Sequence, residues 1–190
     1  MTLACALIEE RARQYEREEP LFAVEQDNIE TFPAAFLDET YTWKDAEWIV
    51  QWYYRRFLGA FPDGERRAGE KAYRRNEFST VQSRIRAAIE TDESTEKIRQ
   101  LTTLEGVDVP VASAFLLFIF PKRYIVVGER EWEALHEANE LTGRYPGPPS
   151  ASEYEVYLTT CREAADRCAV DLWTLYRALW RLAGEHSHAE

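Results

Sequence analysis

The sequence has little cysteine. Its three cysteines, Cys5, Cys161 and Cys168, are odd in number and fit neither a disulfide framework nor a four-ligand zinc site. This usage favours a reducing cytoplasm as the location of the protein. Long apolar runs are also missing, because the longest one, residues 109–121, is too short to span a bilayer. No basic residue precedes the short apolar run at the N-terminus, so we expect neither a secretory signal nor a membrane partner.

Common catalytic and metal-binding motifs are absent as well. The sequence contains no phosphate-binding loop, no Gly-x-Ser-x-Gly elbow and no His-Glu-x-x-His pair. His136 stands alone, and His186 and His188 lie near the C-terminal end, so we expect no metal and no cofactor. Only four of the 23 basic residues are Lys, and the formal net charge is −11. This bias resembles proteins of salt-loving microbes, and the negative charge opposes nucleic-acid binding over the surface as a whole.

Apolar residues, by contrast, make up 45% of the 190 residues and aromatic residues 13%, which is enough for a sizeable core. Their spacing is helical, with no alternation of apolar and polar residues over strand length, and this predicts an all-α fold. Thr42 and Asp108 are predicted to cap helices, and Pro33 is predicted to break one. We expect helices over residues 2–18, 28–39, 42–59, 66–75, 79–90, 96–103, 110–120, 129–141, 152–168 and 171–184.

Residues 104–130 carry the most specific pattern in the chain. The pattern Leu-x-Gly-Val-x-Val-x-x-Ala, which begins at Leu104, resembles the Leu-Pro-Gly-Val-Gly-x-x-Thr-Ala hairpin of helix-hairpin-helix base-excision DNA glycosylases of the endonuclease III type. In such a hairpin, glycine lets the backbone approach a DNA phosphate, and amides at the start of the second helix face the anion. The same register continues without gaps to the Ile-Val-Val-Gly segment that ends at Gly128.

The resemblance implies a two-lobed helical bundle of the helix-hairpin-helix DNA glycosylase type, with DNA across the cleft between the lobes. One lobe would comprise residues 40–143 and hold the hairpin at residues 104–109. The other lobe would be built from both chain ends, residues 1–39 and 150–185, and residues 186–190 would form a disordered tail.

The departures from the family pattern concern its chemistry. Gly128 lies at the position of the catalytic aspartate, and Pro110 lies at the position of the lysine that some members use as a nucleophile. Neither residue can supply an acid or an amine, so no catalytic residue of the family is present. Glu129 and Glu131 are close in sequence, but a shift of one residue at a helix start turns a side chain by about 100°. Asp108 replaces a hairpin glycine and would repel phosphate.

The cysteines also depart from the pattern of some relatives. Cys161 and Cys168 have the spacing of the first two ligands of the iron–sulfur cluster that those relatives hold. No third or fourth cysteine follows them, so we expect no iron–sulfur cluster and interpret both as buried or half-buried helix cysteines.

A basic segment interrupts this acidic chain between residues 55 and 86, which together carry a net charge of +5. Its arginines flank several aromatic residues and could contact phosphates while the rings stack on bases. The alternative is a solvated helical face on which each arginine pairs with a glutamate of a neighbouring turn. The arginines that we single out are Arg55, Arg56, Arg74 and Arg75.

Three functions remain open from the sequence. The leading hypothesis is a catalytically inactive, glycosylase-like protein that binds DNA through Gly106, Val107 and Val109 of the hairpin and through the arginines named above. The alternative is a protein-interaction or structural module that offers the cleft, or the loop at Tyr145, to a protein partner. The third is an enzyme that uses Glu129 or Glu131.

Overall fold

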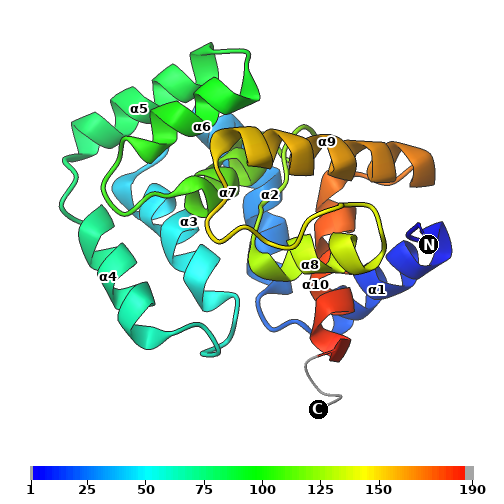
Figure 1. The fold of residues 1–190 in the computed structure, drawn as a ribbon. Helices are drawn as coiled ribbons and strands as arrows, with labels where there is room; N and C mark the ends of the chain where they lie inside the picture. The colour runs from blue at the N-terminus through cyan, green and yellow to red at the C-terminus, as the bar shows by residue number, and fades with distance from the viewer. Residues whose placement is uncertain (1, 187–190) are drawn as a thin grey trace.

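The computed structural model describes residues 2–186, and all regular structure within that range is helical (Figure 1). The prediction of an all-α fold is therefore confirmed. None of the helices in this part of the chain is both long and apolar enough to cross a membrane. The helices are α1 (Cys5–Glu18), α2 (Phe22–Leu37), α3 (Trp43–Arg55), α4 (Asp63–Tyr73), α5 (Phe78–Glu90), α6 (Ser94–Thr102), α7 (Val109–Ile119), α8 (Glu129–Glu137), α9 (Ala151–Cys168) and α10 (Leu172–His186).

Helix α7 forms the centre of the fold because nearly all of its residues are apolar, and every residue from Pro110 to Ile119 is buried. Helices α2, α3 and α6 pack around it (Figure 1). Phe118 of α7 is met edge-on by the rings of Phe32, Trp48 and Trp52, with centroid distances of 6.0, 5.2 and 4.9 Å. The aromatic stripe of α3 is therefore part of the core.

Local signals explain where several helices begin. The side chain of Thr42 accepts a hydrogen bond from the amide of Asp45, and the Asp45 carboxylate accepts one from the amide of Thr42, which is a complete capping box. The prediction for Pro33 is wrong, because α2 begins at Phe22 and continues through that proline. Proline removes one helical hydrogen bond, but the buried side chains of Ile29 and Phe36 on either side hold α2 against the core.

The first and the last helix lie side by side, because α1 packs along α10 (Figure 1). Cys5 of α1 and Cys168 at the end of α9 form a disulfide, with their Cα atoms 5.1 Å apart. The prediction that the cysteines form no disulfide is therefore wrong, since 163 residues separate two partners that only the fold brings together. The inference of a reducing cytoplasm rested on unpaired cysteines and loses that support. Cys161 remains a free thiol and is buried, as expected.

One continuous hydrophobic core runs through the segments that the sequence assigned to two lobes. Helix α8 falls within the range predicted for the hairpin lobe, yet it packs against α10 at the other end of the chain. Of the predicted disordered tail, only His186 belongs to the described residues, and its backbone still forms part of α10. Residues 187–190 lie outside them.

Candidate functional site

The hairpin is a tight turn between α6 and α7, and its geometry requires Gly106. The φ angle of Gly106 is +74°, which L-residues with a side chain rarely adopt. A Cβ atom at this position would also lie 2.5 Å from the carbonyl oxygen of Gly69 and 2.6 Å from the amide nitrogen of Tyr73. The glycine therefore allows α4 to pack directly on the hairpin, and that contact covers the side where a Cβ would project.

Internal acceptors occupy amides at this turn. The carboxylate of Asp108 accepts a hydrogen bond of 3.1 Å from the amide of Val111, which confirms Asp108 as the cap of α7. The side chain of Asn76 accepts a hydrogen bond from the amide of Glu105 and donates one to its carbonyl, both at 3.0 Å. A carboxylate of the chain itself thus lies where the resembled hairpins receive a phosphate. Val107 is buried and Val109 is half-buried, so neither offers a large exposed contact.

Gly128, at the expected aspartate position, is buried and caps the start of α8. A Cβ atom there would lie 2.6 Å from Oε2 of Glu131 and 2.8 Å from Nη2 of Arg56. These two side chains form an ion pair, with Nη1 of Arg56 donating to Oε1 of Glu131 at 2.5 Å. Their side chains are 1% and 0% exposed. The space beside Gly128 is therefore filled by a buried salt bridge.

Aromatic rings enclose the Arg56 guanidinium. Its central carbon lies between 4.7 and 5.7 Å from five ring centroids, a geometry in which each ring face attracts the cation. Burial by itself lowers the pKa of Arg56, but Glu131, Tyr176 and Tyr53 together outweigh it and the pKa is raised overall. The charge is thus permanent and held inside the protein. The rings belong to Trp52, Tyr53, Phe57, Tyr176 and Trp180.

The carboxylate of Glu131 lies beside Gly128, the position at which the resemblance implies an aspartate. A glutamate at the third position of a helix reaches back toward the residue before the helix, as in a capping box. This carboxylate is sealed from solvent and paired with Arg56, so it cannot reach a substrate. Glu129 is exposed in the first turn of α8. Pro110, at the expected lysine position, is buried in the first turn of α7.

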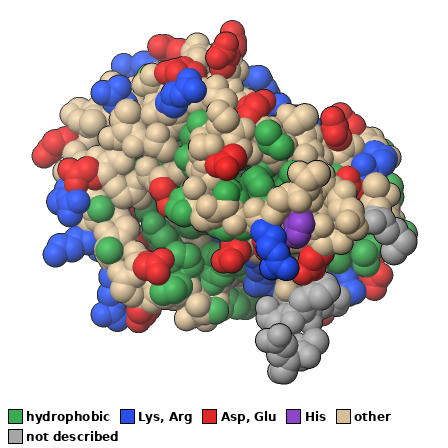
Figure 2. Space-filling view, viewed as in Figure 1, with side chains coloured by type: hydrophobic (Ala, Val, Ile, Leu, Met, Phe, Trp, Pro, Cys, Tyr) green, Lys and Arg blue, Asp and Glu red, His purple; other side chains and the backbone are tan. Residues whose placement is uncertain are grey.

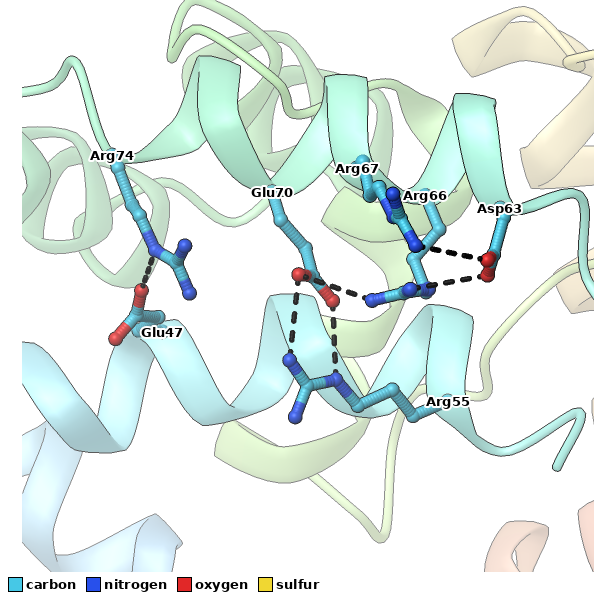
Figure 3. A network of polar contacts seen from close by, with 7 residues as sticks. All are labelled: Glu47, Arg55, Asp63, Arg66, Arg67, Glu70 and Arg74. Atoms are coloured by element: carbon cyan, nitrogen blue, oxygen red, sulfur yellow. Dashed lines mark hydrogen bonds and ion pairs between the residues drawn. The ribbon is translucent and has the colours of Figure 1, made fainter. Parts of the chain in front are cut away.

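Acids pair with most arginines of the basic segment (Figure 3), but only the pairs of Arg66 and Arg67 join neighbouring turns of one helix, as the alternative interpretation supposed. Glu70 of α4 accepts from Arg55 at 3.1 Å and from Arg66 at 3.5 Å, and Asp63 pairs with Arg66 and Arg67. Arg56 cannot contact a phosphate at all, because it is buried. The two remaining arginines that we singled out are also paired, Arg74 with Glu47 at 2.6 Å and Arg75 with Glu105 of the hairpin at 2.5 Å.

The surface between α4 and α8, which we call the α4–α8 face, is apolar and acidic. Figure 2 shows hydrophobic side chains gathered there with isolated acidic ones among them, while the Lys and Arg side chains over α4 lie toward the edge. Burial raises the pKa of Tyr145 in the loop after α8, and the neighbouring carboxylates of Asp108, Glu131 and Glu129 raise it further. Tyr145 therefore lies among these acids, between the hairpin and α8.

His136 lies 3.1 Å from the carbonyl oxygen of Leu141 through Nδ1. Among residues 2–186, no group of three or more His, Cys, Asp or Glu side chains is arranged to hold a metal ion.

The sequence interpretation missed the Arg56–Glu131 pair, although one signal for it exists. Arg56 follows Trp48 and Trp52 at four-residue spacing and so continues the stripe of α3 that packs into the core. Comparisons of the chain with protein families, with curated proteins and with solved structures gave no match. The resemblance to the glycosylases therefore stays a resemblance of one segment.

Proposed function

We propose that the protein is a non-enzymatic interaction module that binds a protein partner at the α4–α8 face. The observation that carries the proposal is the character of this face. Its aromatic and acidic side chains surround a position where the Arg56–Glu131 pair fills the space beside Gly128. A face of this kind lacks both a reacting group and the cations that hold a phosphate backbone.

The apolar part of the face supports a protein partner over nucleic acid. The rings of Phe57 and Phe61 lie 5.3 Å apart at the end of α3, and both side chains remain half-buried rather than covered. Leu58 between them in sequence is 59% exposed. Aromatic and aliphatic side chains of this type anchor protein interfaces. Asp108 and Glu129 are exposed near Tyr145, and they favour a partner segment that carries basic residues beside its apolar ones.

Nucleic-acid binding, the leading hypothesis from sequence, receives less support from the same contacts. A phosphate at the hairpin would have to displace the Asp108 carboxylate from the amide of Val111. A phosphate at the basic segment would have to displace the carboxylates that pair with Arg55, Arg74 and Arg75. Surface ion pairs are individually weak, about 0–1 kcal/mol, but the displaced carboxylates would remain beside the phosphate and repel it. The carboxylate that lies beside Gly128 is not accessible for base excision, because Glu131 is buried.

A site-specific crosslinking experiment tests the proposal. A photo-reactive amino acid replaces Leu58 in the cells that make the protein, and the control replaces Val156 of α9, which is exposed to the same 59%. We expect a nuclease-resistant protein adduct from position 58 and none from position 156. The purified partner should then bind the wild-type protein, and Leu58→Glu should weaken binding by about tenfold or more while Val156→Glu leaves it unchanged.

Titrations of duplex, abasic-site and single-stranded DNA over a KCl series complete the test. We expect no binding at any salt concentration. Binding whose affinity falls steeply as salt rises would overturn the proposal and support the nucleic-acid hypothesis instead. Release of a damaged base that disappears on Glu131→Gln or Glu129→Gln would overturn it in favour of an enzyme.

A further inference from the structure

A second candidate site lies at the other end of α7 from the hairpin. A groove of about 550 Å³ opens there between α2, the end of α7 and the start of α10. It adjoins a second hollow of about 430 Å³ beside the end of α9, and the two share Lys122, Arg123 and Asp171. Because α7 has 11 residues, the groove is about 16 Å from the hairpin along the helix axis.

The larger groove has an apolar wall held in a fixed position. Ile29 and Pro33 lie one turn apart on the same side of α2, and Phe120 and Trp173 complete the lining from α7 and α10. The indole Nε1 of Trp173 donates a hydrogen bond of 2.9 Å to the side chain of Gln26, which ties α10 to α2 across the groove. This wall buries an aliphatic chain without opening any existing contact.

The smaller hollow brings together three cations, Lys122, Arg123 and Arg162. In residues 2–186, where most arginines pair with an acid, none of these three forms an ion pair. Arg162 donates two hydrogen bonds, of 3.1 and 2.6 Å, to the carbonyl oxygen of Arg123, so its guanidinium is positioned by the backbone rather than by a carboxylate. Cationic side chains that are held in position but have no carboxylate partner favour the binding of an anionic ligand.

The acids around the two hollows are partly engaged with internal donors. The carboxylate of Asp171 accepts a hydrogen bond of 2.6 Å from the amide of Thr174 and caps α10. The carboxylate of Glu30 accepts one of 2.7 Å from the side-chain amide of Gln26. Asp166 is exposed at the rim. The free charged donors of the site are thus those of the three cations, and Asp166 remains a free acceptor among them.

We infer that this site binds a single-chain amphipathic carboxylate. Its aliphatic chain lies along Ile29, Phe120 and Trp173, and its carboxylate lies at Lys122, Arg123 and Arg162. The volumes of both hollows fall in the range of about 300–1,000 Å³ that is usual for small-ligand sites. The inference is independent of the protein partner proposed above, because the α4–α8 face shares none of these residues.

Calorimetric titration of the full chain at low salt tests the two parts of the site separately. Decanoate is the probe for the anion, and decanol and decyltrimethylammonium are its neutral and cationic counterparts. We expect decanoate to bind at a ratio of one to one and the other two to bind at least about tenfold more weakly. Octanoate should bind more weakly than decanoate, by about two- to fourfold for each methylene removed.

Charge-reversed variants locate the site. Lys122→Glu combined with Arg123→Glu should weaken decanoate binding by about tenfold or more. The control combines Lys44→Glu with Lys71→Glu, which changes the net charge equally at exposed lysines outside the groove and should leave binding unchanged. Thermal melting of both variants verifies that they fold.

Three outcomes would overturn the inference. The first is equal binding of the neutral, cationic and anionic probes, and the second is an equal loss of binding in both double variants. The third is association with phosphatidylglycerol vesicles when decanoate itself does not bind, since that would identify a membrane surface rather than a free carboxylate as the ligand.

Discussion

Replacing Gly128 by alanine tests the central feature of the structure, the buried pair that fills the space beside it. The new Cβ atom would lie 2.6 Å from Oε2 of Glu131 and 2.8 Å from Nη2 of Arg56. Real Cβ contacts are never this short, so the pair must move. Four of the five rings around Arg56 are buried, which leaves little room for the shift. The substitution therefore forces either strained packing or a separation of the two charges.

The two responses have different costs. Overpacking of a well-packed core costs about 1–3 kcal/mol. Separation of a buried ion pair leaves uncompensated charges and costs about 3–5 kcal/mol. We expect Gly128→Ala to lower the free energy of unfolding by an amount within these ranges. Urea denaturation followed by tryptophan fluorescence measures it, because two of the rings around Arg56 are the tryptophans Trp52 and Trp180.

Gly64→Ala is the matched control. A Cβ atom at Gly64, in the first turn of α4, would meet no atom within 4 Å, and its backbone is not left-handed. Its stability should stay within about 0.5 kcal/mol of wild type. If Gly128→Ala were as stable as this control, the space beside Gly128 would be open and the argument for a sealed site would fail. Gly128→Asp should likewise release no base from damaged DNA, and measurable release by that single variant would refute the same reasoning.

Three further predictions concern stability. Burial raises the pKa of Glu25, and the hydrogen bonds from Trp52 and Tyr15 lower it by less. The pKa in the folded state therefore exceeds the ordinary 4.5, and the folded state keeps the proton to a higher pH than the unfolded state. Stability should therefore fall as pH rises from about 4.5 through the raised pKa; Glu25→Gln should remove this component from urea midpoints measured over pH, and unchanged slopes would contradict it. Joint replacement of Cys5 and Cys168 by serine should cost about 2–5 kcal/mol and abolish the effect of reductant on the midpoint, whereas a wild-type midpoint indifferent to reductant would argue against the disulfide. Gly106→Ala should cost more than about 1 kcal/mol in thermal melts, because it combines a φ of +74° with a backbone clash, and Gly143→Ala, which meets nothing, should not.

The parts of the fold that sequence predicts are those set by local chemistry. Helix α7 lies at the centre because its residues are apolar throughout, which the sequence shows directly, and its cap at Asp108 follows from one short carboxylate before a helix start. Thr42 was identified as a cap in the same way. Pro33 shows the limit of such reasoning. Proline costs α2 one hydrogen bond, but the burial of the rest of the helix offsets that cost, and the local sequence does not show how deeply the helix is buried.

The parts that sequence did not predict are contacts between distant segments. Cys5 and Cys168 are 163 residues apart, and Arg56 and Glu131 are 75 apart. The sequence around one residue of such a pair does not indicate which distant residue is its partner. The same applies to the basic segment, because part of its neutralisation comes from Glu47 and Glu105, which lie outside residues 55–86.

Gly128 and the Arg56–Glu131 pair are one feature rather than two. With the pair in place, only glycine fits at position 128, and with glycine there, Glu131 can reach back without a clash. Residues that contact one another in this way are energetically coupled, so a change at one alters the cost of a change at the other. A working acid therefore cannot be introduced at position 128 by one substitution, because its carboxylate would compete with that of Glu131 for the same buried guanidinium. Access to such an acid would require an opening of the aromatic enclosure around Arg56 as well, so the accessibility of position 128 depends on the packing of α3, α8 and α10.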